Sequence, residues 1–126
     1  MFRLYQGHDP EDFQARIRIF TADEGGRLKP PHNGIRWDFM YEDGSDLYAI
    51  WPDFFDEEGN SFSTEEPLPI NEPLLARMYI LNPEMRVKIH QAEIREDVRF
   101  FCMEGLTRVA EGIVWKVMGL HATPPR

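Results

Sequence analysis

The side chains with the greatest intrinsic reactivity are one cysteine and four histidines: Cys102, His8, His32, His90 and His121. A thiol beside an imidazole can act as a nucleophile activated by a base, so Cys102 and His90 form one candidate pair. Cys102 lies in an apolar strand-like segment, however, where a buried and inert thiol is expected. The histidines lack zinc-type spacing. We therefore predict no catalytic residue, no metal site and no cofactor.

Carboxylates are concentrated in the middle of the chain. Residues 37–76 contain eleven Asp and Glu and no Lys, Arg or His, whereas the rest contains eleven acids and fourteen Lys and Arg; the net charge is -8. The Asp-x-Asp-x-Asp-Gly pattern of a calcium loop is absent. An acidic region of this kind repels phosphate and attracts a basic partner.

Aromatic side chains lie among these acids, in the stretch WPDFFDEEGNSFSTEEPLPINEP from Trp51 to Pro73. The stretch is too long for a hairpin loop and too aromatic for a plain linker. Two interpretations are open: a solvated loop whose phenylalanines pack onto the core, or a partner-binding loop with aromatic anchors ringed by charge. The predicted partner-binding residues are Asp53, Phe54, Phe55, Asp56, Glu57, Glu58 and Phe62.

The elements that position these residues are expected to be strands, because apolar and polar residues alternate with a period of two and helical spacing is nowhere sustained. The segments with this pattern are 13–19, 35–41, 47–51, 74–80, 87–89, 98–102 and 108–118. Pro52 should end the third, and the last should place Val109, Ile113, Trp115 and Val117 on one side. Short strands separated by turns predict a small all-β sandwich or barrel.

Length and composition predict one globular domain, residues 1–126, with an acidic aromatic loop at about 42–72. No apolar run is long enough to span a membrane, and the N-terminus lacks the apolar core of a secretory signal. A single cysteine excludes an internal disulfide and fits a reducing compartment. We therefore expect a cytoplasmic protein.

The stretch FQARIRIFTADEGGRLKPPHNGIRWDF, from Phe13 to Phe39, resembles the C-terminal β-barrel domain of translation elongation factor Tu. That domain has a strand, a Glu-Glu-Gly-Gly-Arg turn, a Pro and then Gly-Tyr-Arg-Pro-Gln-Phe. The matching positions are Asp23, Glu24, Gly25, Gly26, Arg27, Pro30, Gly34, Arg36 and Phe39. The closing hairpin is similar at Glu104, Gly105, Arg108, Val109, Gly112 and Val114. Segment 69–89 resembles the family's Pro-Gly-Asp turn and the strand after it.

The chain also departs from this family. Ile35, Trp37 and Asp38 replace the family's Tyr and Pro-Gln, Leu106 replaces a turn glycine, and the acidic segment is longer. A Gly-x-x-x-x-Gly-Lys-Ser/Thr phosphate loop is missing, so GTP binding is not expected.

The resemblance implies a small six-stranded antiparallel barrel. We expect it to be closed or nearly closed, with these residues inside: Ile17, Ile19, Phe39, Met78, Phe100, Val114 and Val117. It also implies an edge that contacts the T-stem of tRNA, carried over by position to Arg27, His32, Asn33 and Arg36. Turn chemistry alone is the other explanation of the glycines and prolines in this stretch.

Two functional classes follow from these observations. The first expectation is a non-enzymatic protein-interaction module, such as an inhibitor or immunity-type protein, that binds a basic protein partner. The alternative is a translation-associated module that binds tRNA or a translation factor, which the net charge of -8 disfavours. Neither class requires GTP or a membrane.

Overall fold

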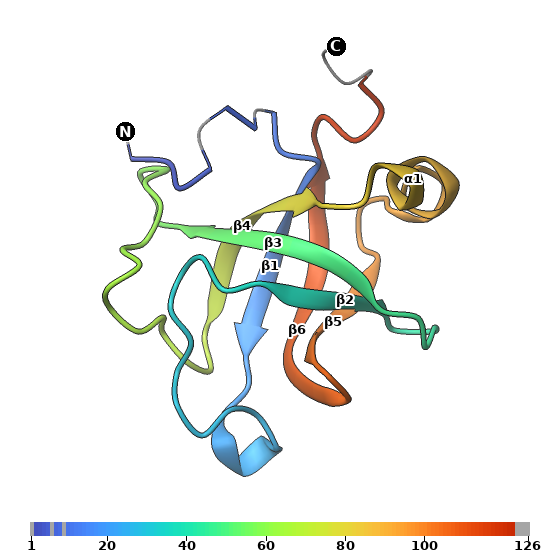
Figure 1. Ribbon diagram of the computed structural model, residues 1–126. Helices are drawn as coiled ribbons and strands as arrows, with labels where there is room; N and C mark the ends of the chain where they lie inside the picture. The colour runs from blue at the N-terminus through green and yellow to red at the C-terminus, as the bar shows by residue number, and fades with distance from the viewer. Residues whose placement is uncertain (1, 6, 9, 123–126) are drawn as a thin grey trace.

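The protein is a closed six-stranded antiparallel β-barrel, seen in a computed structural model that describes residues 2–5, 7–8 and 10–122 (Figure 1). The strands are β1 (Phe13–Ile19), β2 (Trp37–Tyr41), β3 (Tyr48–Phe55), β4 (Pro73–Ile80), β5 (Arg99–Glu104) and β6 (Thr107–Val117). They pair in the order β1-β4-β3-β2-β5-β6, and β6 returns to β1. The predicted all-β barrel is confirmed. Among the described residues, no helix is both long and apolar enough to cross a membrane.

The barrel interior is filled by the inward side of every strand. The predicted inner residues from Ile17 to Val114 are all buried, and Val117 is partly buried against them. The rings of Phe39 and Phe100 stack at a centroid distance of 4.5 Å, and Phe13 meets both rings edge-on. Alternating strand residues therefore supply the core, as their period predicts.

The last strand departs from strict alternation at two β-bulges. Cys102 pairs with Ala110 and Met103 pairs with Arg108, so Val109 is the extra residue of a β-bulge. The bulge shifts the phase of β6, and the prediction that Val109 and Ile113 face the same side is wrong. Downstream of this bulge Gly112 and Val114 are buried, whereas Ile113 and Trp115 are only partly buried. A second bulge lies at Trp115, because Gln14 pairs with Lys116 and Ala15 with Val114, and beyond it Val117 packs against the core.

Strand β3 does not end at Pro52, as the sequence had suggested, but continues to Phe55. The reason lies in its pairing. Strand β3 pairs with β2 only as far as Ile50 and with β4 along the rest of its length. Beyond Ile50 one side of β3 has no partner strand, and a proline is tolerated at such an edge.

The segment around Val87 and Ile89, expected to be a strand, is helical. It comprises α1 (Pro83–Met85), the π-helical turn η2 (Arg86–His90) and α2 (Gln91–Glu93). The Asn82 side chain accepts hydrogen bonds from the N–H groups of Glu84 and Met85, and Pro83 occupies the first helical position. These start signals outweigh a spacing of two apolar residues.

Candidate functional site

The connection between β3 and β4, residues 56–72, is here called the acidic loop. It lies beside the barrel in Figure 1, in light green and yellow-green. The side chains of Glu57, Glu58, Glu65, Glu66 and Glu72 are exposed. At the start of the loop, the Asp56 carboxylate accepts hydrogen bonds from the N–H groups of Glu58 and Asn60, each at 3.0 Å. This Asx-type turn fixes the loop tip.

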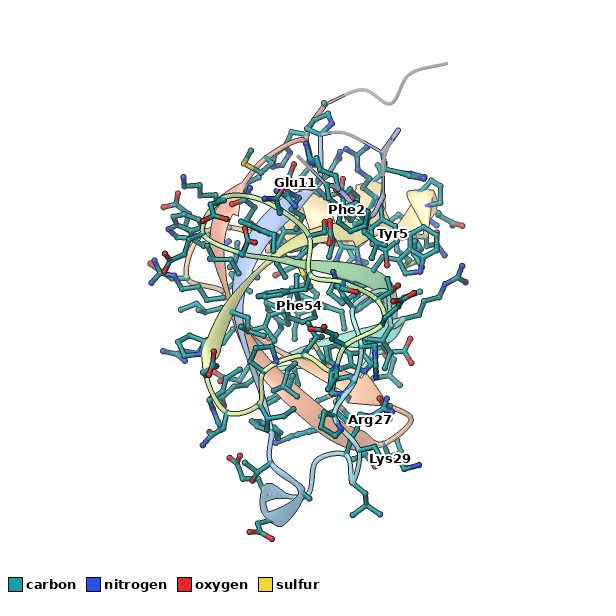
Figure 2. The ribbon with its side chains drawn as sticks, turned by 90° about the vertical axis from the view of Figure 1, so that its left-hand side faces the viewer. Phe2, Tyr5, Glu11, Arg27, Lys29 and Phe54 are labelled. Carbon is teal, nitrogen blue, oxygen red and sulfur yellow. The ribbon has the colours of Figure 1, made fainter. Side chains whose placement is uncertain are left out.

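Two of the predicted partner-binding residues are not on the surface. Asp53 and Phe54 belong to β3 and are fully buried. The Phe54 ring meets Trp37 edge-on at a centroid distance of 6.1 Å, and Figure 2 shows it at the centre of the face that carries the acidic loop. Neither side chain can contact a partner, so their assignment to the binding loop is wrong. They support the loop from beneath instead.

Asp53 organises a buried polar cluster under the acidic loop. Its Oδ2 accepts a hydrogen bond from Ser61 Oγ at 2.8 Å and lies 3.5 Å from Arg77 Nη1. Arg77, itself buried, also donates to the carbonyl of Gly59 at 2.6 Å. A buried carboxylate and a buried guanidinium therefore compensate each other while both bind the loop.

Asn33 belongs to the same buried cluster. Its side-chain oxygen accepts from the N–H of Phe54 at 2.9 Å, and its amide donates to the carbonyls of Phe54 and Phe62 and to Asp53. It is 3% exposed. The resemblance to elongation factor Tu had placed Asn33 on a tRNA-binding edge. Its burial excludes that contact and makes Asn33 a structural link between β3 and the acidic loop.

The first described residues also pair with the acidic loop, which the sequence did not indicate. Asn60 Oδ1 accepts from the N–H of Phe2 at 2.9 Å, and the N–H of Ser61 donates to the carbonyl of Phe2 at 2.8 Å. Tyr5 stacks on Trp51 with the ring centroids 4.8 Å apart. Burial, aided by the nearby carboxylate of Asp53, raises the pKa of Tyr5 to about 12.

Four of the five other predicted loop residues meet in one pocket of about 320 Å³, here called the loop pocket. Its lining comprises Phe55, Asp56, Glu57, Phe62, Glu72, Pro73, Leu74 and Leu75. The Arg77 guanidinium lies 4.1 Å from the centre of the Phe55 ring and holds that ring in place. Within the described part of the chain, Glu57 and Glu72 make no ion pair. The fifth remaining residue of the prediction, Glu58, does not line the pocket and is exposed at the tip of the same loop.

The chemistry of the loop pocket suits a cation carried on an apolar stem. Phe55 and Phe62 offer aromatic faces, and carboxylates stand beside them. Lys and Arg side chains combine an apolar stem with a charged end, and they bind well between rings and carboxylates.

The remaining residues of the predicted family-like edge do not form a common basic surface. Arg27 pairs with Glu104 at 2.6 Å, and His32 Nδ1 lies 3.0 Å from the carbonyl of Thr64. The guanidinium of Arg36 stacks on Trp51 at 4.5 Å from the ring centre. Each side chain therefore has an intramolecular partner of its own.

The reactive side chains are also accounted for. Cys102 is fully buried in β5, and burial raises its pKa far above the usual range. His90 pairs with Tyr41, whose Oη lies 2.7 Å from Nδ1. In the described part of the chain, no three His, Cys, Asp or Glu side chains form a group able to hold a metal ion.

Comparisons with known proteins give no relative from which a role could be transferred. No family model matches the chain, and no curated protein is similar to it in sequence. A barrel of this size supports many unrelated functions.

Proposed function

We propose that this protein is a non-enzymatic interaction module whose loop pocket receives a Lys or Arg side chain of a basic protein partner. The observation that carries the proposal is the convergence of two aromatic rings and three carboxylates on one pocket of about 320 Å³. An inhibitor or immunity-type protein that covers the anion-binding surface of a basic enzyme is the class that fits best.

Charge and shape have separate roles in this proposal. The net charge of -8 and the exposed carboxylates of the acidic loop accelerate encounter with a basic partner. Phe55 and Phe62 then bind the apolar stem of the entering side chain, which sets the dissociation rate. The buried cluster around Asp53 holds the loop in its binding conformation before the partner arrives.

The alternative, a translation-associated module related to elongation factor Tu, is favoured by a different surface. The outward side chains of β1, β5 and β6 include Arg16, Arg18, Arg99 and Arg108, here called the arginine face. The first three line a hollow of about 240 Å³ together with Phe101. Clustered arginines beside an aromatic ring suit a phosphate backbone.

The test uses the double variant Glu57→Lys, Glu58→Lys. A matched control, Asp23→Lys with Glu96→Lys, makes the same charge change at exposed positions outside the acidic loop. We expect partners captured from cell extract with the wild type to associate more slowly with the loop variant, and with weaker salt dependence, than with the control. Stability should change little, because exposed charges rarely decide it.

A defined probe gives a direct second readout. An acetylated tetra-arginine peptide should perturb the NMR signals of Phe55 and Phe62, and a tetra-glutamate peptide should not. Equal capture and equal salt sensitivity in all variants would mean that the acidic loop is only a solvated surface. Salt-sensitive tRNA binding below about 1 µM, lost on Arg16→Glu with Arg99→Glu, would favour the alternative instead.

A further inference from the structure

A second pocket lies away from the acidic loop, where the helical segment 83–93 covers one end of the barrel. It has a volume of about 400 Å³. It is lined by Asp46, Leu47, Tyr48, Ala49, Ile80, Asn82, Met85, Ile89 and His90. The helical segment and the turn between β2 and β3 both lie on the right-hand side of Figure 1. We call it the His90 pocket.

One nitrogen of the buried His90 ring has no hydrogen-bond partner among the described residues. The side chain is 2% exposed, and its Nδ1 lies 2.7 Å from Tyr41 Oη. Nε2 has no hydrogen-bond partner among the described residues, yet it is not among the fully enclosed polar atoms that lack one. His90 is also one of the residues that line the pocket.

The His90 ring is fixed and uncharged at neutral pH. Rings of Phe39, Tyr41 and Tyr48 surround it, with centroid distances of 5.9, 5.8 and 4.7 Å. Burial lowers the pKa of His90 to about 4. A neutral imidazole with one ring nitrogen bonded to Tyr41 offers the other nitrogen as a single hydrogen-bonding group.

The rest of the pocket combines negative charge with apolar surface. Asp46 lines it and forms no ion pair with any described residue. Asp46 and Glu93 lie close enough to the Tyr48 hydroxyl to raise its pKa, in addition to the effect of burial. The apolar lining is Leu47, Ile80, Met85 and Ile89. Tyr48 adds an aromatic ring beside the carboxylate.

We propose that the His90 pocket binds a primary ammonium group carried on an apolar body. The ammonium group has three donors and no acceptor. Asp46 supplies the countercharge, Tyr48 a ring face, and His90 Nε2 an acceptor, with Nδ1 protonated and donating to Tyr41. The apolar body packs on Ile80, Met85 and Ile89.

Other ligand classes fit less well. An anion would meet Asp46 with Glu93 nearby and no described cation in the lining. A purely apolar molecule would remove water from Asp46 and His90 Nε2 without replacing their hydrogen bonds, which costs free energy. The inference is independent of the acidic loop, because the two pockets have no lining residue in common.

The experiment compares three six-carbon probes by NMR titration and calorimetry: hexylamine, hexanol and hexanoate. We expect hexylamine to bind and to shift the His90 imidazole nitrogens, with Nε2 reporting an accepted hydrogen bond. Hexanol should bind at least about tenfold more weakly, because it lacks the charge, and hexanoate should not bind. Equal binding of hexylamine and hexanol would overturn the proposal.

Variants locate the ammonium group. Asp46→Asn should weaken hexylamine binding at least about tenfold, since a cation loses its countercharge. The matched control Asp43→Asn removes a neighbouring acid that does not line the pocket, and it should bind hexylamine nearly as the wild type does. Both positions are exposed, so both variants should fold. Wild-type affinity in Asp46→Asn would contradict the proposal.

A last arm separates the two sources of such a group. Nα-acetyl-lysine N-methylamide presents the same ammonium group on the side chain of a protein residue. If it binds as tightly as hexylamine, the natural ligand is a lysine of another protein; if only hexylamine binds, the ligand is a free amine. If neither hexylamine nor the lysine derivative binds, the proposal for the His90 pocket is wrong. The loop-pocket proposal would be unaffected, because it is tested with Glu57 and Glu58.

Discussion

The acidic loop and the arginine face carry opposite charge, and they differ in how far that charge is satisfied within the molecule. On the arginine face, Arg18 pairs with Glu24 at 2.9 Å and with Glu111 at 3.2 Å. Arg16 and Arg108 stack on rings, at 5.2 and 4.2 Å from the centres of Trp115 and Phe101. In the loop pocket, by contrast, the carboxylates of Glu57 and Glu72 have no cationic partner among the described residues. A partner therefore gains more at the acidic loop.

The two regions also differ in what supports them. The arginine face stands on β1, β5 and β6, which are joined by long antiparallel ladders of backbone pairs, each with one β-bulge. The acidic loop is held mainly by side chains, with Asn33 and the Asp53–Arg77 pair at the centre. The strands under the arginine face should therefore tolerate single substitutions. The acidic loop should lose its fixed conformation when one buried group of its side-chain cluster is removed.

The largest expected effect is that of Phe54→Ala, beneath the acidic loop. Removing a fully buried ring should lower the free energy of unfolding by about 3–5 kcal/mol. Phe55→Ala, at the partly buried neighbour, should cost less stability but should abolish binding of the arginine peptide. Urea unfolding measures the first effect and NMR titration the second. A loss below about 1 kcal/mol at Phe54 would show that the core closes without it.

Asn33→Ala should loosen the acidic loop while sparing the arginine face. The substitution leaves the N–H of Phe54 and the carbonyl of Phe62 without this partner, while the carbonyl of Phe54 keeps the N–H of Phe62. We expect a loss of about 2 kcal/mol in stability. Hydrogen exchange should show reduced protection at residues 54–62 and unchanged protection in β5. Uniform loss of protection throughout the barrel would break the distinction between the two regions.

Gly112→Ala tests the packing directly under the arginine face. A Cβ at Gly112 would lie 2.3 Å from Cζ of Phe100, a ring that is stacked on Phe39 and cannot easily move. Overpacking of this kind should cost about 1–3 kcal/mol in thermal or urea unfolding. Gly44→Ala is the control, because its nearest neighbour, Tyr41 Cβ, is 3.6 Å away. Equal stability of the two variants would mean that β6 shifts to make room.

The smallest effect concerns the ion pair between Arg18 and Glu24. Hydrogen bonds from Arg18, then from the N–H of Thr21, lower the pKa of Glu24 from 4.5 to about 2. The pair therefore contributes stability above pH 4.5, and that contribution is lost as the pH falls toward 2. Arg18→Gln should raise the Glu24 pKa in an NMR titration. An unchanged pKa would mean that the arginine face leaves its charges free, as the acidic loop does.

The barrel itself could be predicted because strand alternation is local in sequence. The helical segment was missed because Val87 and Ile89 are two residues apart, which fits a strand, while the Asn82–Pro83 start signal was not weighed against that spacing. The inward-facing residues of β6 were predicted wrongly because a bulge depends on the neighbouring strand, here β5, rather than on β6 alone.

The candidate sites were predictable only in part. Phe55, Asp56, Glu57 and Phe62 could be grouped from the sequence because they lie close together in it, and they line one pocket; their contact with a partner stays a prediction. The burial of Asp53 and the role of Asn33 depend on pairing between residues 20 positions apart. The contact between Tyr41 and His90 joins residues 49 positions apart and arises only when the helical segment folds over the barrel end. Such long-range pairs leave no periodic signal in the chain.

Closure of the barrel has a consequence for how the chain is made. Strand β1 leaves the ribosome first, yet its two neighbours are β4 and the late β6. Until β6 has been synthesised, β1 and β5 both present unpaired backbone groups along an open edge. Barrel closure therefore waits for the last strand, and a nascent chain stalled before residue 107 is a species for chaperones to shield from edge-to-edge pairing with its neighbours.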